Sequence, residues 1–180
     1  PLENILGRQM TDRSMAEDLI VMDRNTNRLL DLTNQLLDFQ KIEKERLSLN
    51  LTRQNVTDIV EETFYRFSSS AKQQHKTFEL DPGEGAIHAQ VDREAFTKIL
   101  SNLMNNALKY SETMIRVGLS VAGDAFRLTV TNDGEVVPPE MREAIFAPFF
   151  RHTLKEESTG TGIGLALSRS LAELHHGTLA

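Results

Sequence analysis

The stretch NLMNNALKY, residues 102–110, places three asparagines in the second half of a helix that apolar spacing predicts for residues 93–110. Asn102, Asn106 and Lys109 fall at positions i, i+4 and i+7, so they share one stripe of this helix. Asparagine weakens helix interiors because its side chain competes for backbone hydrogen bonds. Three asparagines in one helix therefore indicate that their side-chain amides have a role other than helix formation. The core face beside the stripe is predicted to contain Phe96, Ile99, Leu100, Leu103 and Ala107.

Amide oxygens and a lysine on one stripe fit a site for phosphate and a divalent metal. A neutral amide oxygen can bind Mg²⁺ without adding negative charge beside phosphates, and the Lys109 ammonium can offset phosphate charge. The alternative is a polar flank whose amides bond to the backbone or to water. The stripe alone leaves both interpretations open.

A glycine-rich segment, STGTGIGL at residues 158–165, leads directly into a predicted helix over residues 164–176. Alternating glycines let backbone N–H groups approach a phosphate, and the start of the helix adds partial positive charge. A dinucleotide-binding strand is excluded because residues 151–157 are polar, and the lysine of a P-loop is missing. A mobile structural loop is the alternative.

Two further segments lie between these elements. Residues 131–135 read TNDGE after a predicted strand, and residues 146–150 read FAPFF. Three of the nine phenylalanines crowd into those five positions, which predicts an apolar clasp. Simple core packing explains each phenylalanine equally well.

The first part of the chain has the periodicity of a coiled coil. Over residues 14–46, apolar or small side chains recur at alternating spacings of four and three: Met15, Leu19, Met22, Thr26, Leu29, Thr33 and Leu36. Leu30 and Leu37 widen this stripe, as in a helical bundle. We therefore predict an oligomerising hairpin with residues 2–6 as the stub of the first helix, in preference to a long solvated helix.

The remainder predicts an α+β domain over residues 47–180, following a helical part over residues 1–46. Alternation at Leu47, Leu49 and Leu51 predicts a first strand. Further strands are predicted at residues 77–80, 87–91, 114–121 and 125–131, and helices at residues 56–74, 93–110 and 164–176. Asp92 is a predicted N-cap, and Gly177 is predicted to end the last helix.

The composition of the chain excludes or disfavours several classes of protein. The 180 residues contain 20 Lys and Arg against 26 Asp and Glu, a net charge of −6, which disfavours direct binding of nucleic acid. The absence of cysteine excludes disulfides, thiolate zinc sites and cysteine nucleophiles. No apolar run is long enough to cross a bilayer. Because the chain begins at Pro1, we expect a piece of a longer protein.

In combination, four segments resemble the N box, first glycine box, F box and second glycine box of sensor histidine kinases: NLMNNALKY (102–110), VTNDGEVVP (130–138), IFAPFF (145–150) and GTGIGLALS (160–168). RLLDLTNQLLDFQKIE (28–43) is similar to the second helix of their dimerisation and phosphotransfer hairpin, especially in hybrid sensors. The resemblance implies a coiled-coil-like helical hairpin followed by a Bergerat-type (GHKL) ATP-binding fold, an α/β sandwich with a mixed sheet.

The resemblance also implies roles for individual residues. Asn106 would ligate Mg²⁺, Asn102 would lie beside the triphosphate and metal, Lys109 would meet phosphate, and Tyr110 would lie near the nucleotide. Arg151 is a candidate cation of the lid over the site. The other implied nucleotide-binding residues are Asn132, Gly134, Gly160, Thr161, Gly162, Gly164 and Leu165.

The chain departs from the family pattern in three respects. Asn132 and Val136 replace an Asp and a Gly of the first glycine box, so adenine binding is expected to be weaker or altered unless Asp133 compensates. None of the five histidines matches the phosphoacceptor, which is expected before this chain begins. One or two further strands are expected after Ala180.

The resemblance implies the ATP-binding catalytic part of a histidine kinase, which transfers the γ-phosphoryl of Mg-ATP to a histidine for relay to a response regulator receiver domain. The parent is expected to be a homodimer tethered to the inner membrane, with this part in the cytoplasm and unable to phosphorylate itself alone. One alternative is a nucleotide-binding or structural dimerisation module in which Asn132 and Val136 have abolished useful ATP affinity. A DNA clamp related to gyrase is disfavoured by the acidic balance and the long coiled-coil seam.

Overall fold

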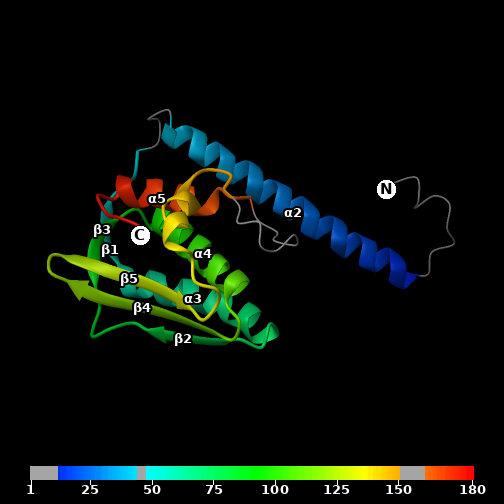
Figure 1. Ribbon diagram of the computed structural model, residues 1–180, viewed down its shortest axis with the longest axis horizontal. Coiled ribbons are helices and arrows are strands. Elements are labelled where there is room, and N and C mark those ends of the chain that lie inside the picture. Colours follow the sequence, from blue (N-terminus) through cyan, green and yellow to red (C-terminus); the bar gives the residue numbers. More distant parts are fainter. Residues whose placement is uncertain (1–11, 44–47, 151–160) are drawn as a thin grey trace.

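The computed structural model describes residues 12–43, 48–150 and 161–180 (Figure 1). Predictions for the stub at residues 2–6 and for Leu47, Arg151 and Gly160 lie outside these residues. The helices are α2 (Asp12–Glu43), α3 (Val56–Gln73), α4 (Arg93–Tyr110) and α5 (Gly164–Leu174), with short 3₁₀ helices η1 (Pro139–Met141) and η2 (Ala144–Phe146). The strands are β1 (Thr52–Asn55), β2 (Thr77–Asp81), β3 (His88–Val91), β4 (Met114–Ala122) and β5 (Ala125–Asn132).

A mixed three-stranded sheet forms one layer of the α+β domain. Its strand order is β2-β4-β5, with β2 parallel and β5 antiparallel to β4, which confirms the predicted mixed sheet. Along β4, Ile115, Val117 and Leu119 are buried while their neighbours are exposed or half-buried. This alternation places helices against one face, and Figure 1 shows α3 and α4 lying along the sheet. On the other face of the sheet, Met114, Arg116 and Ser120 of β4 are exposed.

The first strand differs from its prediction. Leu49 and Leu51 precede β1, which begins at Thr52 and pairs antiparallel with β3. Leu49 instead packs against the hydrophobic core from outside the strand. The polar sequence of β1 is tolerated because half of this short strand is exposed in a two-stranded pair. Leucine alternation therefore identified one residue that packs on the core, Leu49, but misplaced the strand.

Helix α4 has the predicted core face. Phe96, Ile99, Leu100 and Ala107 are buried, Leu103 is half-buried, and Met104, which the sequence pattern did not single out, is fully buried as well. Because this face anchors α4 in the core, the asparagine stripe beside it is held at the edge of the domain.

Helix α2 is long and extends beyond the domain (Figure 1). The predicted seam positions Met15, Leu19, Met22, Leu29 and Leu36 are exposed in the single chain. At the other end of the helix, Phe39 and Ile42 pack against the domain core. One end of α2 is therefore seated on the domain, while an apolar stripe remains uncovered along the rest of the helix.

Asp92 joins three parts of the chain at the start of α4. One carboxylate oxygen accepts from Ala95 N (3.0 Å), which confirms the predicted N-cap, and the other accepts from Asn50 N (2.9 Å). The backbone N–H of Asp92 donates to Nε2 of His175 (3.1 Å), just after α5. Burial opposes the charged carboxylate, but the N–H groups of Ala95 and Asn50 outweigh it, so the pKa of Asp92 lies below its usual value.

The end of α5 corrects another prediction. His176, with φ of 59°, takes the left-handed position that we predicted for Gly177. Its N–H donates to Glu173 O and that of Gly177 donates to Ala172 O (both 2.9 Å), which is a Schellman motif. Histidine is among the residues that accept this conformation more readily than most, so glycine is not required here.

We predict that Asp92→Ala lowers the free energy of unfolding by about 1–2 kcal/mol, because it removes the N-cap and leaves the Asn50 N–H without its acceptor. Asp92→Asn should cost less, because an amide oxygen still caps Ala95. Urea unfolding at pH 7 measures both, with exposed Glu84→Ala as the control. An Ala variant as stable as the wild type would contradict this role for Asp92.

Candidate functional site

A cavity of about 930 Å³ opens along the asparagine stripe of α4, between β5, the η1–η2 segment and the start of α5. Nine of the predicted site residues line it: Asn102, Asn106, Lys109, Tyr110, Asn132, Thr161, Gly162, Gly164 and Leu165. Gly134 lies next to Asn132 without lining the cavity, and Arg151 and Gly160 are outside the described residues. The structure thus brings together segments that are far apart in the sequence.

Asn102 ties α4 to α5. Its amide nitrogen donates to Gly164 O (3.2 Å) and to Oγ of the fully buried Ser168 (3.1 Å). A Cβ on Gly164 would lie only 3.6 Å from the Asn102 side chain, so the two helices meet closely here. Since the nitrogen is engaged, the oxygen is the atom of Asn102 that remains for a ligand.

Asn106 and Lys109 are available to a ligand. The Asn106 side chain is half-buried on the cavity wall and makes no hydrogen bond to any of the described residues. Lys109 Nζ lies 4.8 Å from the centre of the Tyr110 ring and forms no ion pair within the described ranges. The cavity therefore offers an amide oxygen and an uncompensated ammonium on adjacent turns of α4.

The glycine segment packs against the F box. Gly162 has φ of +71°, and a Cβ there would lie 2.7 Å from the Phe149 backbone, so glycine is required. Phe149 N donates to Gly162 O (2.9 Å). Phe146 and Phe150 are half-buried and line the cavity, whereas Phe149 is 62% exposed. The predicted apolar clasp therefore involves two of the three phenylalanines.

The start of α5 can receive an anion. Ile163 is its N-cap residue and no side chain among the described residues caps the first turn, so its N–H groups keep their partial positive charge. Gly164 and Leu165, in that first turn, line the cavity. Asn102 lies beside them through its bond to Gly164 O. This end of the cavity combines helix N–H groups with an amide oxygen.

The first glycine box lies at the other end of α4. A Cβ on Gly134 would fall 1.8 Å from Tyr110 O, so only glycine fits against the end of the helix. Asn132 Oδ1 accepts from Gly134 N (2.9 Å). Because α-helices rise about 1.5 Å per residue, Asn102 and Tyr110 are roughly 12 Å apart along the helix. A cavity of this length, with apolar walls such as Leu108 and Val130, can hold a nucleoside triphosphate lengthwise.

Asp133 cannot compensate for Asn132, contrary to that expectation. Its carboxylate accepts from the Thr113 hydroxyl (2.6 Å) and from the backbone N–H groups of Glu112, Thr113 and Met114 (2.9–3.0 Å). These bonds, that of the hydroxyl foremost, hold the pKa of Asp133 far below its usual range. The carboxylate fixes the link between α4 and β4 instead of facing the cavity.

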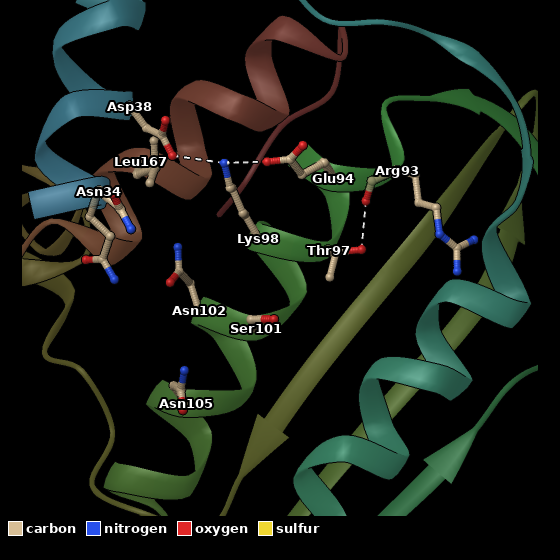
Figure 2. Close-up of a pocket in the computed structure, with 11 residues that line it drawn as sticks. Asn34, Asp38, Arg93, Glu94, Thr97, Lys98, Ser101, Asn102, Asn105 and Leu167 are labelled. Carbon is tan, nitrogen blue, oxygen red and sulfur yellow. Dashed lines mark hydrogen bonds and ion pairs between the residues drawn. The ribbon is translucent and has the colours of Figure 1, made fainter. Parts of the chain in front are cut away.

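A second cavity of about 650 Å³ lies between α2 and α4. Figure 2 shows Lys98 of α4 reaching between Asp38 of α2 and Glu94, at 3.0 and 3.1 Å. Burial opposes the charge on Lys98, but bonds to the two carboxylates outweigh this effect and raise its pKa. Asn102 and Asn105 lie farther along α4 in Figure 2, and both line the larger cavity as well.

Sequence reasoning missed two residues near the site. Gln35 lines both cavities from α2, and the seam pattern gave no sign of this because the residue lies outside the apolar stripe. Lys76 Nζ donates to Leu108 O (2.5 Å) and Ser111 O (2.8 Å), which holds the last turn of α4. A positive charge is favourable at the C-terminal end of a helix. Local sequence did not reveal, however, that Lys76 would contact the end of α4.

The donor set also bears on the metal. Within the described residues, no three His, Cys, Asp or Glu side chains cluster to hold an ion. A metal at this site would therefore be held by amide oxygens together with phosphates of the ligand, which suits Mg²⁺. The free oxygen of Asn106 and that of Asn102 fit this requirement.

Across the described ranges, no helix combines the length and apolarity needed to span a membrane.

Comparison with known proteins identifies the family. The model of the histidine kinase-, DNA gyrase B- and HSP90-like ATPases matches residues 91–180. Sensor histidine kinase TmoS of Ectopseudomonas mendocina is 33% identical over 100% of this chain and 19% of its own length. Sensor histidine kinase CpxA of Escherichia coli is 34% identical over 98% of this chain and 35% of its own length. This chain thus spans about a third or less of the length of these relatives.

Solved structures show the same fold. The histidine kinase AdeS of Acinetobacter baumannii has a TM-score of 0.75 at 22% identity, covering 96% of this chain and 80% of that one. Full-length ShkA in complex with AMPPNP has a TM-score of 0.75 at 22% identity, covering 93% and 35%. ThkA in complex with the response regulator TrrA has a TM-score of 0.74 at 22% identity, covering 98% and 49%.

The family model covers half of the chain, and the matched half contains the asparagines and lysine of α4 and the glycine segment at the start of α5 that line the cavity. The chain belongs to the histidine kinase-, DNA gyrase B- and HSP90-like ATPase family, and the relatives that it matches over nearly its whole length are sensor histidine kinases.

Proposed function

We propose that this chain binds Mg-ATP in the larger cavity and transfers the γ-phosphoryl group to a histidine nitrogen of a phosphotransfer hairpin. The bond from the γ-phosphorus to the bridging oxygen breaks, a phosphorus–nitrogen bond forms, ADP leaves, and the histidine loses a proton. The observation that carries the proposal is that Asn106, Lys109 and the uncapped start of α5 face one cavity. Such transfer depends mainly on positioning and charge neutralisation.

Each end of the cavity has its own proposed task. Asn106 Oδ1 holds Mg²⁺, with Asn102 Oδ1 beside it, and Lys109 neutralises phosphate charge. Backbone N–H groups at Gly162 and Gly164, with Thr161 and Leu165, bind the phosphates. Mg²⁺, when bound, would offset the negative charge of the phosphates.

The base lies at the opposite end in this proposal. Asn132 faces the adenine amino group and Tyr110 lies beside the nucleotide, with Gly134 allowing the close approach of the first glycine box to α4. Glu135, the acidic residue among the described lining, belongs to this end as well, so no described carboxylate is placed to activate water at the phosphates. Rapid hydrolysis of ATP is therefore not expected.

The parent protein is a further part of the proposal. We assign residues 1–46 to a dimerisation and phosphotransfer part and residues 47–180 to the catalytic domain. The uncovered apolar stripe of α2 supports a homodimer, and the similarity to ThkA, solved with a response regulator, supports a receiver domain as partner. The relatives that are named as sensors support a membrane-tethered parent with this part on the cytoplasmic side of the inner membrane. Nucleic acid is not a proposed ligand.

We predict that Asn106→Ala weakens binding of a non-hydrolysable ATP analogue by about tenfold or more in the presence of Mg²⁺, because a contact with a charged group is lost. Without Mg²⁺ the variant and the wild type should bind alike, since Asn106 acts through the metal. Calorimetric titration measures both conditions, with Asn25→Ala on exposed α2 as control. If the wild type gives no heat at millimolar ligand, the non-binding structural module is the better description.

Transfer itself can be followed with γ-labelled ATP. Alone, the chain should remain unlabelled, and a separate hairpin that carries the acceptor histidine should become labelled when this chain is added. Asn106→Ala should lower the rate of that labelling at least as much as it lowers the affinity for the nucleotide. Self-labelling of the isolated chain, or a hairpin that stays unlabelled at saturating Mg-ATP, would contradict the proposed reaction.

A further inference from the structure

Gln35 is the point at which α2 reaches the nucleotide cavity. It is half-buried and lines both this cavity and the smaller one between α2 and α4. Of the α2 side chains that the structure describes, no other lines the larger cavity. A residue of the helical part therefore forms part of the wall around the proposed ligand.

Two hydrogen bonds fix how the Gln35 amide is turned. Ile163 N donates to Thr161 Oγ1 (3.1 Å), so this oxygen acts as an acceptor. The Thr161 hydroxyl in turn donates to Gln35 Oε1 (3.1 Å). The oxygen of the Gln35 amide is directed at Thr161. The Nε2 group is therefore available as a donor, and it has no partner within residues 12–43, 48–150 and 161–180.

The neighbouring turns of α2 hold Gln35 in place. Asp38, three residues on, pairs with Lys98 of α4 at 3.0 Å, and Figure 2 shows this pair bridging the two helices. Phe39 and Ile42 pack against the core of the domain. The position of Gln35 is thus set by an ion pair and by apolar packing, independently of its own bond to Thr161.

The surroundings of Nε2 favour an anion. Thr161 and Gly162 lead into the uncapped first turn of α5, where backbone N–H groups carry partial positive charge. An amide N–H that donates to an ionised oxygen forms a stronger hydrogen bond than one between neutral groups. A phosphate bound by this turn would bring such oxygens to the wall that Gln35 occupies.

We propose that Gln35 is a nucleotide-binding residue supplied by α2, with Nε2 donating to a phosphate oxygen of the ligand held at the start of α5. This inference rests on the proposed function, because it needs a nucleotide in the larger cavity. The bound phosphate then joins α2 to the catalytic domain through Gln35, so nucleotide occupancy strengthens the seat of α2 on that domain.

The experiment compares Gln35→Glu with Gln40→Glu in the full chain. Gln35→Glu keeps an oxygen for the Thr161 hydroxyl but replaces the donor with a negative oxygen, so affinity for Mg²⁺ and a non-hydrolysable ATP analogue should fall at least tenfold. Gln40→Glu makes the same charge change at an exposed position of α2 outside both cavities and should stay within twofold of the wild type. Adenosine, which lacks phosphate, should bind both variants and the wild type equally in NMR titrations.

The outcomes separate this inference from the proposed function. A tenfold loss confined to Gln35→Glu and to the phosphorylated ligand supports it. If Gln35→Glu binds the triphosphate as tightly as the wild type, or if adenosine binding falls equally, Gln35 does not contact phosphate and the inference is wrong while the proposed function stands. If the wild type itself binds no Mg nucleotide, both are wrong.

Discussion

The amide nitrogen of Asn102 makes the contact on which the geometry of the site depends. By donating to Gly164 O and Ser168 Oγ, it joins the middle of α4 to the first turn of α5. This contact places the stripe that carries Asn106 opposite the helix start that carries the free N–H groups. Core packing of the adjacent face of α4 and the Asp92 cap hold the helix against the sheet, so the stripe cannot rotate away. The nitrogen of Asn102 therefore fixes the packing of α4 against α5, while its oxygen is left for the proposed ligand.

Local patterns predicted much of this arrangement. The bounds of α3, α4, β4 and β5 followed from periodicity and from the Asp92 cap, since these signals lie within each segment. Long-range contacts decided the rest. The bond between Thr161 and Gln35 joins residues 126 apart, and no local pattern assigns Gln35 to the cavity. Asp133 was misread for the same reason, because its partners Glu112, Thr113 and Met114 lie 21, 20 and 19 residues earlier in the sequence.

The two ends of the cavity differ in charge. The end at the start of α5 carries helix N–H groups with partial positive charge, whereas the end at the first glycine box presents the neutral Asn132, whose oxygen already accepts from Gly134 N. With Asp133 committed to the loop after α4, the carboxylate expected at the base is not replaced by its neighbour. In the proposed function, affinity therefore depends chiefly on the contacts that Asn106, Lys109 and Gln35 are proposed to make with the metal and the phosphates.

The most direct measurement of a shared metal and phosphate site is paramagnetic broadening of backbone amide signals by Mn²⁺ bound with a non-hydrolysable ATP analogue. Amides of Asn106 and of Gly162 to Leu165 should both broaden on addition of the complex, while those of Gly123 and Asp124 at the tip of the β4–β5 hairpin should not. Broadening at only one of the two helices, or at neither, would contradict a single site formed by both.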